Sequence, residues 1–201
     1  MTRLARLLRR DERGAAIVEF ALVLVPLLLF LFGGLDLGYQ AYLRSVVQGA
    51  LNDVSRTGSL EGPQLNCTGA TVEEQIQCAI KARSNVVARN ATYTITTKNF
   101  YDFSTVGRSE KLVTDYNGNG QYDTGDCFVD LNGNGAFDTS AGRTGVGGAD
   151  DVVFYTVKLS MPRLFPIHKF ISTTSNYEIN ATAAVRNQPY STQQVPPTIC
   201  V

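Results

Sequence analysis

Side chains that carry most enzyme chemistry are scarce in this chain. Its 201 residues include one histidine, His168. A catalytic or zinc role is not expected for a lone imidazole without a second histidine or a plausible serine or cysteine partner. The glycine-rich stretch 142–148 also lacks the lysine of a phosphate-binding P-loop. These absences indicate a protein that is not an enzyme.

An excess of charge of either sign is absent as well. Lysine and arginine together number 18, as do aspartate and glutamate, so the formal net charge is zero. Without a basic excess, a nucleic-acid partner is not expected. The charges are nevertheless unevenly placed. Five arginines precede Gly14, and residues 115–151 hold seven aspartates against the single Arg143.

Charge is nearly missing from Ala15–Leu35, which contains one charged side chain, Glu19, in 21 residues. A helix of this length spans roughly 31 Å, about the thickness of the hydrocarbon core of a bilayer. Because arginines precede the run and none follows it directly, we expect a cytoplasmic N-terminus and a domain across the membrane. A carboxylate near the centre of such a helix costs roughly 2.5–3.5 kcal/mol, which makes Glu19 a candidate functional residue.

Two other interpretations of this N-terminus remain open. A secretory signal would have an apolar stretch of about 7–15 residues followed by small residues, whereas Gly14, Ala15 and Ala16 come before the run. A plain uncleaved membrane anchor fits the length of the run but gives no reason for Glu19.

The junction between leader and apolar run resembles that of type IV prepilins. From Gly14 to Phe20 the chain reads GAAIVEF, after a basic leader and before an apolar helix. The resemblance implies that prepilin peptidase cuts between Gly14 and Ala15 and removes residues 1–14. It also implies that Glu19 becomes the fifth residue of the mature chain and neutralises the terminal amine of a neighbouring subunit. Such a pair offsets the desolvation of both charges.

The short leader and the position of Glu19-Phe20 look most like the Flp/Tad (tight adherence) branch of that family. Removing 14 of the 201 residues leaves 187, a size similar to that of the larger TadE-like minor pseudopilins. The closing sequence Arg186-Asn187-Gln188-Pro189 is also similar to the end of TadE-like proteins, although Gln188 stands where an acidic residue is usual.

This resemblance implies a structural role in assembly or priming of a Tad/Flp-type pilus. The partners that it implies are prepilin peptidase, other pilins and pseudopilins, inner-membrane Tad assembly proteins and the lipid bilayer. The chain would be a single-pass inner-membrane protein with a periplasmic domain that can enter an extracellular pilus. The alternative is a membrane-anchored calcium-binding adhesion or sensor domain outside any filament.

Hydrophobic periodicity predicts the remaining elements. Apolar side chains recur every three or four residues through Asp36–Thr57, so we expect the helix to continue as an amphipathic half that ends at Gly58. A capping box at Thr71–Glu74, with Glu74 reaching back to Thr71, should begin a second helix that runs to about Arg89. Ile76, Ile80 and Val87 should face inward from that helix. The expected strands are Ala91–Lys98, Val152–Ser160 and Tyr177–Arg186.

The expected fold class is α+β, in which a long N-terminal helix packs on a small antiparallel sheet as in type IV pilins. The domain boundaries that we expect are a leader at 1–14, a transmembrane helix at 15–35 and a periplasmic domain at 36–187. Calcium-type loops are inserted into that domain at 115–151, and residues 188–201 form an irregular tail.

Four cysteines in an exported domain indicate two disulfides. They are Cys67, Cys78, Cys127 and Cys200, and they allow three connectivities. We favour Cys67–Cys78 as a local loop, with Cys127–Cys200 fastening the tail. Free thiols would require a reducing compartment, against which the expected topology argues.

An internal repeat with an offset of 15 residues resembles the start of EF-hand calcium loops, D-x-[DN]-x-[DN]-G. Oxygen ligands at positions 1, 3 and 5 face one point because the glycine at position 6 turns the chain, and positions 7, 9 and 12 add ligands. The expected Ca2+ ligands are Asp115, Asn117, Asn119, Gln121, Asp123 and Asp126 in the first loop, and Asp130, Asn132, Asn134, Ala136 and Asp138 in the second.

The second loop lacks the carboxylate of position 12, where Ala141 stands. We expect Asp150 or Asp151 to replace it from outside the loop, or the second site to be weaker. No amphipathic helices flank the repeat, so its use would be structural and unlike that of an EF-hand pair. The alternative is a run of Asn-Gly turns without a metal.

Overall fold

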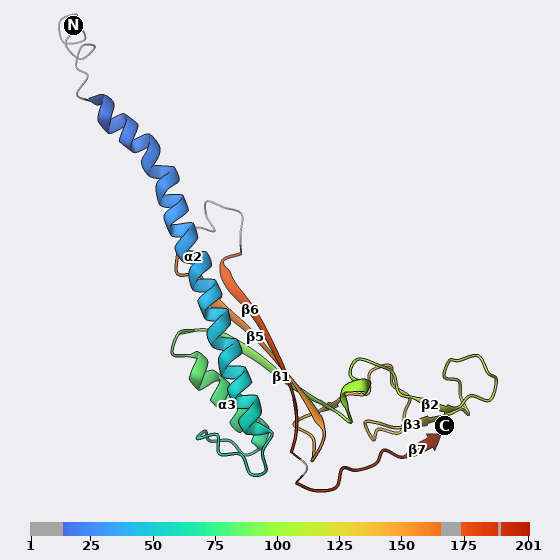
Figure 1. The fold of residues 1–201 in the computed structure, drawn as a ribbon. Helices are drawn as coiled ribbons and strands as arrows, with labels where there is room; N and C mark the ends of the chain where they lie inside the picture. The colour runs from blue at the N-terminus through green and yellow to red at the C-terminus, as the bar shows by residue number, and fades with distance from the viewer. Residues whose placement is uncertain (1–13, 166–173, 189) are drawn as a thin grey trace, which may run out of the picture. The chain divides into compact units, whose positions relative to one another are not determined.

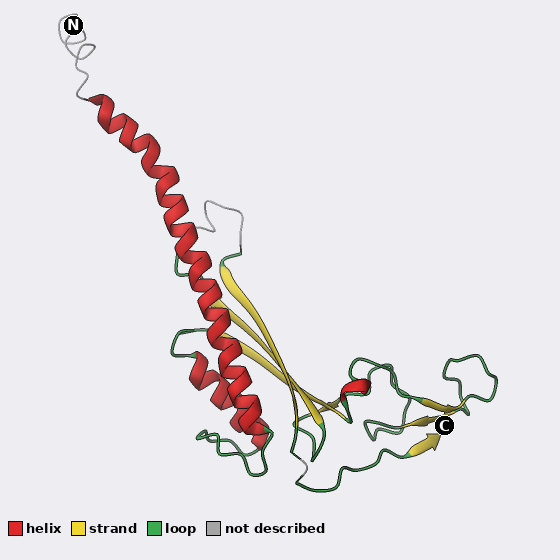
Figure 2. Cartoon of the chain, in the orientation of Figure 1, coloured by secondary structure: helices red, strands yellow, loops and turns green. Residues whose placement is uncertain are grey.

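The computed structural model describes residues 14–165, 174–188 and 190–201. It confirms the α+β layout, with a long N-terminal helix followed by small antiparallel sheets (Figures 1 and 2). The chain divides into two compact units. One comprises Met1–Tyr42 with Pro162–Tyr177, and the other comprises Leu43–Met161 with Glu178–Val201.

The long helix, α2, runs from Ala15 to Gly58 over 44 residues, as the apolar run and the amphipathic stripe predicted. Pro26 lies inside it without ending it. An 18-residue window of the helix has a mean hydropathy of 2.6 and none of that window is buried, so α2 is long and apolar enough to cross a membrane.

The second unit has its core between the last turns of α2 and a sheet. Leu43, Val47, Leu51 and Val54 recur at helical spacing and are fully buried. The Gln48 amide on the same part of the helix donates a hydrogen bond to the Thr182 carbonyl of the sheet. The amphipathic half therefore packs on the sheet as expected.

Helix α3 covers Val72–Ser84 and is shorter than predicted. Asn85 caps its C-terminus by donating its backbone amide to the Lys81 carbonyl, and the chain then turns, so a helix to about Arg89 was wrong. Ile76 and Ile80 are fully buried as expected, whereas Val87 is only half-buried.

The N-terminal cap of α3 differs from the predicted capping box in one hydrogen-bond partner. The Thr71 hydroxyl accepts the Glu74 amide at 3.2 Å, as predicted. The Glu74 carboxylate, however, accepts the Ala70 amide at 2.7 Å, one residue before the predicted partner, Thr71.

The larger sheet has the strand order β4-β1-β5-β6. Figure 1 shows β1, β5 and β6 of this sheet side by side. The three long strands are β1, Thr92–Phe100, β5, Val152–Pro162, and β6, Asn176–Arg186. Their ends differ from the predicted ranges by at most two residues. β4 is the short strand Arg143–Thr144, which was not predicted. Strands β1 and β5 are antiparallel, with Thr92 opposite Ser160 and Phe100 opposite Val152. Alternate residues of β5 and β6 are buried, so one face of the sheet supplies the core.

A second, three-stranded sheet has the order β2-β3-β7. Its strands are β2, Leu112–Thr114, β3, Cys127–Val129, and β7, Thr198–Cys200. The tail was expected to be irregular, and β7 corrects this because its residues pair antiparallel with β3.

Both disulfides have the favoured connectivity, Cys67–Cys78 and Cys127–Cys200. Cys127 and Cys200 are direct partners in the register of β3 and β7. The covalent bond therefore holds the tail in the second sheet, which explains why so short a strand forms there.

Candidate functional site

The residues expected at the processing and assembly site lie at the start of α2. Ala15 is the first residue of the helix, and Glu19 and Phe20 follow in its first turns. The Glu19 side chain is exposed, as are Gly14 and Phe20. The leader residues 1–13 lie outside the described part of the chain, and so does His168. An exposed carboxylate among apolar side chains is available to a group from another chain.

Within the described residues, the apolar side chains of the first half of α2 are largely uncovered. Ile17, Leu22 and Phe30 are 71%, 74% and 82% exposed. A helix that shows apolar side chains on all sides is expected in lipid or among other helices. The first half of α2 is therefore compatible with single-pass anchoring in a membrane.

The first calcium-type loop is closed by hydrogen bonds from its own residues. Asp115 accepts the backbone amides of Gly118 and Gly120, each at 2.7 Å. These amides lower the pKa of the Asp115 carboxyl, the Gly120 bond being the largest cause, so the group stays ionised. The side-chain amides of Asn117 and Asn119 both donate to the same Asp123 oxygen at 2.7 Å.

The second loop repeats this arrangement residue for residue. Asp130 accepts the amides of Gly133 and Gly135 at 2.7 and 2.9 Å. The side-chain amides of Asn132 and Asn134 converge on Asp138 Oδ2 at 2.5 and 2.6 Å. The other expected ligand positions, Gln121 and Ala136, donate their backbone amides to Asn119 and Asn134.

The position-12 carboxylate of the first loop, Asp126, is buried and accepts the amides of positions 2 and 9. These donors are Tyr116 at 3.0 Å and Asp123 at 2.9 Å. In the second loop the same two positions, Leu131 and Asp138, donate at 2.7 and 3.0 Å to a residue outside the loop, Glu110.

Glu110 thus does for the second loop what Asp126 does for the first. It is 2% exposed, and burial raises its pKa. The expectation that Asp150 or Asp151 would replace the missing carboxylate was wrong. Sequence reasoning missed Glu110 because it lies 20 residues before Asp130 and is brought there by the pairing of β2 with β3.

The loops show no preformed cluster of anionic ligands. In the described ranges, no three His, Cys, Asp or Glu side chains are grouped so as to hold a metal ion. Most of the expected ligands in the loops are asparagine side-chain oxygens and backbone oxygens. A group made only of His, Cys, Asp and Glu side chains does not include such ligands. The amide nitrogens of the asparagines face the carboxylates of Asp123 and Asp138.

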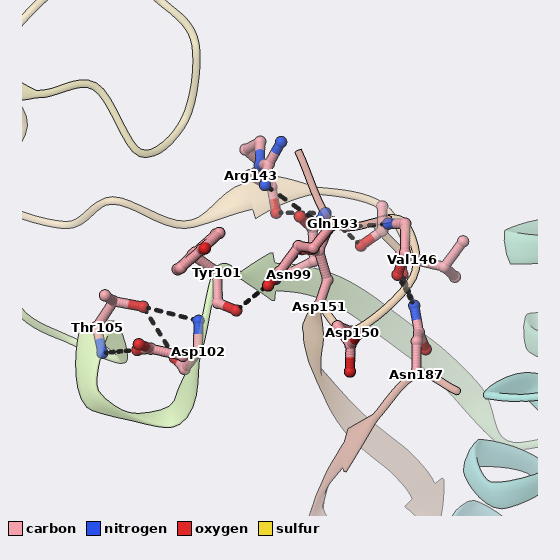
Figure 3. Close-up of polar contacts among 12 residues, drawn as sticks. Asn99, Tyr101, Asp102, Thr105, Arg143, Val146, Asp150, Asp151, Asn187 and Gln193 are labelled. Carbon is pink, nitrogen blue, oxygen red and sulfur yellow. Dashed lines mark hydrogen bonds and ion pairs between the residues drawn. The ribbon is translucent and has the colours of Figure 1, made fainter. Parts of the chain in front are cut away.

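Asp151 instead belongs to a polar network at the end of the larger sheet (Figure 3). It accepts the Gly148 amide at 2.8 Å and the Gln193 side-chain amide at 3.0 Å. Asn187, in the closing sequence after β6, donates to the carbonyls of Val146 and Gly148 at 2.8 and 2.7 Å. The closing sequence therefore fastens the turn that follows β4.

Comparison with protein families decides what the first segment is. Residues 14–56 match the family model of TadE-like proteins. The N-terminal helix is TadE-like. This confirms the resemblance to TadE-like proteins that the short leader and the position of Glu19-Phe20 indicated, and it connects the chain with Tad pilus systems, whose TadE-like proteins are structural. No curated protein and no solved structure matches the chain.

The TadE-like segment contains one functional candidate that sequence reasoning passed over. Asp36, the first residue after the apolar run, is 1% exposed. It forms an ion pair with Arg163 and accepts the Tyr177 hydroxyl at 2.5 Å. Burial, and then this hydrogen bond, raise the pKa of Tyr177 to about 12. A carboxylate directly after a membrane-length run was the available signal, but neither partner is near it in sequence.

Proposed function

We propose that this protein is a structural minor pseudopilin of a Tad/Flp-type pilus, processed by prepilin peptidase between Gly14 and Ala15. The observation that carries the proposal is the extent of the family match. It begins at Gly14 and ends at Arg56, so it covers the helix and none of the sheets. The part of the chain that matches the family is thus the part that contains the expected cleavage site, the expected membrane anchor and the expected assembly residue.

In this proposal Glu19 sets the axial register between subunits. Cleavage creates an α-amino group at Ala15, whose pKa near 7.7–8.0 leaves it largely protonated at neutral pH. The exposed Glu19 of a neighbouring helix supplies the opposite charge. One axial offset satisfies both charges, and any other offset leaves a charge unpaired in apolar surroundings, which is costly.

The domain would lie in the periplasm, with the N-terminus cytoplasmic before cleavage and α2 in the inner membrane. Partners would be prepilin peptidase, other pilins or pseudopilins, and the inner-membrane Tad assembly proteins. Two disulfides suit an oxidising compartment, which supports the periplasmic side.

Pilus formation in cells that carry Glu19→Ala tests this role. The variant should enter the membrane as well as the parent, because removing a charge from an apolar run favours insertion. Pili should be lost or strongly reduced. Val18→Ala, at the neighbouring exposed position, is the control and should leave pili normal. Normal pilus formation with Glu19→Ala would refute the proposed pairing.

We also propose that the two loops bind Ca2+ as structural sites. The support is the repeated geometry, in which each loop has a position-1 aspartate closed by two amides and a buried carboxylate on positions 2 and 9. Calcium accepts carboxylate, amide and backbone oxygens in flexible geometry. A rotation of each asparagine side-chain amide by about 180° would exchange its nitrogen and oxygen, so that the oxygen would lie where the nitrogen now lies.

Calcium titration by calorimetry tests the two loops separately. The parent should bind two ions, and Asp126→Asn and Glu110→Gln should each lower the number to one. Asp102→Asn is a matched control, because Asp102 caps the short helix η2, Phe103–Thr105, outside both loops. Chelator should lower the melting temperature of the parent. A melting curve that chelator leaves unchanged would refute the calcium sites but not the pseudopilin role.

A calcium-binding adhesion or sensor domain on a plain anchor remains the second candidate function. The loop geometry favours it only if calcium binds and the leader is retained. The mature N-terminus therefore separates the two candidates.

A further inference from the structure

The start of the connection between β5 and β6 contacts the end of the apolar run of α2. The ring of Phe165 lies 5.7 Å from the ring of Phe32, centroid to centroid. Phe32 comes three residues before Leu35, the end of the run, which is about 4.5 Å along the helix axis. If α2 spans a bilayer, Phe165 therefore lies at the level of its interfacial layer.

Arg163 fixes this short segment to the helix. Its guanidinium pairs with the buried Asp36, and its Nε donates to the Thr174 carbonyl at 2.8 Å. Its Cζ atom lies over the Tyr177 ring, 4.9 Å from the ring centre. Because Asp36 and Arg163 neutralise each other, the segment brings no unpaired charge to the boundary. All of these residues belong to the same compact unit.

The side chains that follow Arg163 extend the apolar surface of the helix. Leu164 is 55% exposed, and the helix residues Leu31 and Leu35, which adjoin Phe32 and Asp36 in the sequence, are 50% and 51% exposed. Tyr39 and Tyr177 pack on each other, with ring centroids 5.5 Å apart. Aromatic side chains with a polar end are typical of membrane interfaces.

We propose that residues 162–165, here called the arm, make a second contact with lipid. Leu164 and Phe165 enter the interfacial layer at the C-terminal end of the span, and Asp36 holds them there through Arg163. Lipid is the occupant because the exposed surface of the arm is continuous with side chains that a membrane-spanning α2 already places in the bilayer. The proposal depends on α2 spanning the membrane and not on assembly into a pilus.

A single tryptophan tests the depth of the arm, because the natural chain has none. Leu164→Trp in the full-length protein is reconstituted in phosphatidylcholine vesicles that contain lipids brominated at defined depths. Two variants calibrate the scale. Phe30→Trp lies inside the run at a site 82% exposed, and Tyr42→Trp, at a site 56% exposed, lies seven residues or about 10 Å beyond it.

Fluorescence of Leu164→Trp should be quenched most by shallow bromines, at a depth between those of the two calibrating variants. Quenching no greater than that of Tyr42→Trp would overturn the lipid contact. Blue-shifted emission without quenching would also overturn it, since it would indicate burial against protein, including a second copy of the chain.

The role of Asp36 is tested in the same background. Adding Asp36→Asn to Leu164→Trp should reduce the shallow quenching at least twofold, because the arm loses its charged anchor. Asp53→Asn is the control: Asp53 lies farther along α2, where it pairs with Arg83 of α3. Unchanged quenching with Asp36→Asn would refute the holding role of the pair.

Discussion

The two halves of helix α2 are both rich in apolar residues, but the burial of these residues differs between the halves. Leu22 and Phe30 of the first half are 74% and 82% exposed, whereas Leu43 and Leu51 of the second half are fully buried. The second half finds its partner in the sheet of its own chain. Among the described residues, Leu22 and Phe30 of the first half have no such cover, so that lipid or other helices would have to supply it. One continuous helix thus joins a folding core to an assembly or membrane surface.

The same substitution in each half should break a different property. Leu51→Asp places an unpaired charge in the core and should cost more than about 4 kcal/mol of folding free energy, enough to unfold a marginal domain. Leu22→Asp should leave the domain folded and make membrane insertion less favourable by roughly 2.5–3.5 kcal/mol. Thermal unfolding and a membrane-extraction assay measure the two effects. Loss of domain folding in Leu22→Asp would contradict the division.

The boundary between the halves depends on the buried pair of Asp36 and Arg163. Arg163→Ala leaves Asp36 buried without its partner and should cost about 3–5 kcal/mol. The double variant Asp36→Leu, Arg163→Leu should recover most of that loss, because an apolar pair needs no charged partner. Denaturant unfolding of the four proteins gives the comparison. A loss of less than about 1 kcal/mol in Arg163→Ala would mean that the pair is exposed to water.

A substitution at Gly49 should give the smallest change in stability in the second half of α2. Gly49 lies inside the helix, is exposed, and has open space where a side chain would begin. Gly49→Ala should therefore stabilise the domain by about 0.5–1 kcal/mol, because glycine is a poor helix former. Gly58→Ala is the contrasting variant, since its added carbon would lie 2.8 Å from Ile76. A destabilised Gly49→Ala domain would show that this face is covered.

The sequence patterns correctly predicted those features that depend on residues close together in the chain. The apolar run and stripe of α2, the hydroxyl cap at Thr71 and the alternation of β5 and β6 are repeated signals within a single element. The end of α3 was missed because a turn after Ser84 replaces a helix that propensity alone would extend.

Features that depend on distant pairs could not be predicted in the same way. Glu110 reaches the second loop through a strand pair, Asp36 meets Arg163 at a sequence separation of 127, and β7 forms because Cys200 is bonded to Cys127. Each depends on the tertiary fold, which leaves no periodic signal in the sequence.

The mature N-terminus tests the central claim most directly. Intact-mass measurement of the protein purified from the membranes of cells with an active Tad system should give a chain that begins at Ala15, and Gly14→Leu should block that cleavage. Because the match to TadE-like proteins starts at residue 14, cleavage there would link the uncovered half of α2 to pilus assembly. A parent chain that retains Met1 would contradict processing and leave α2 as a simple anchor.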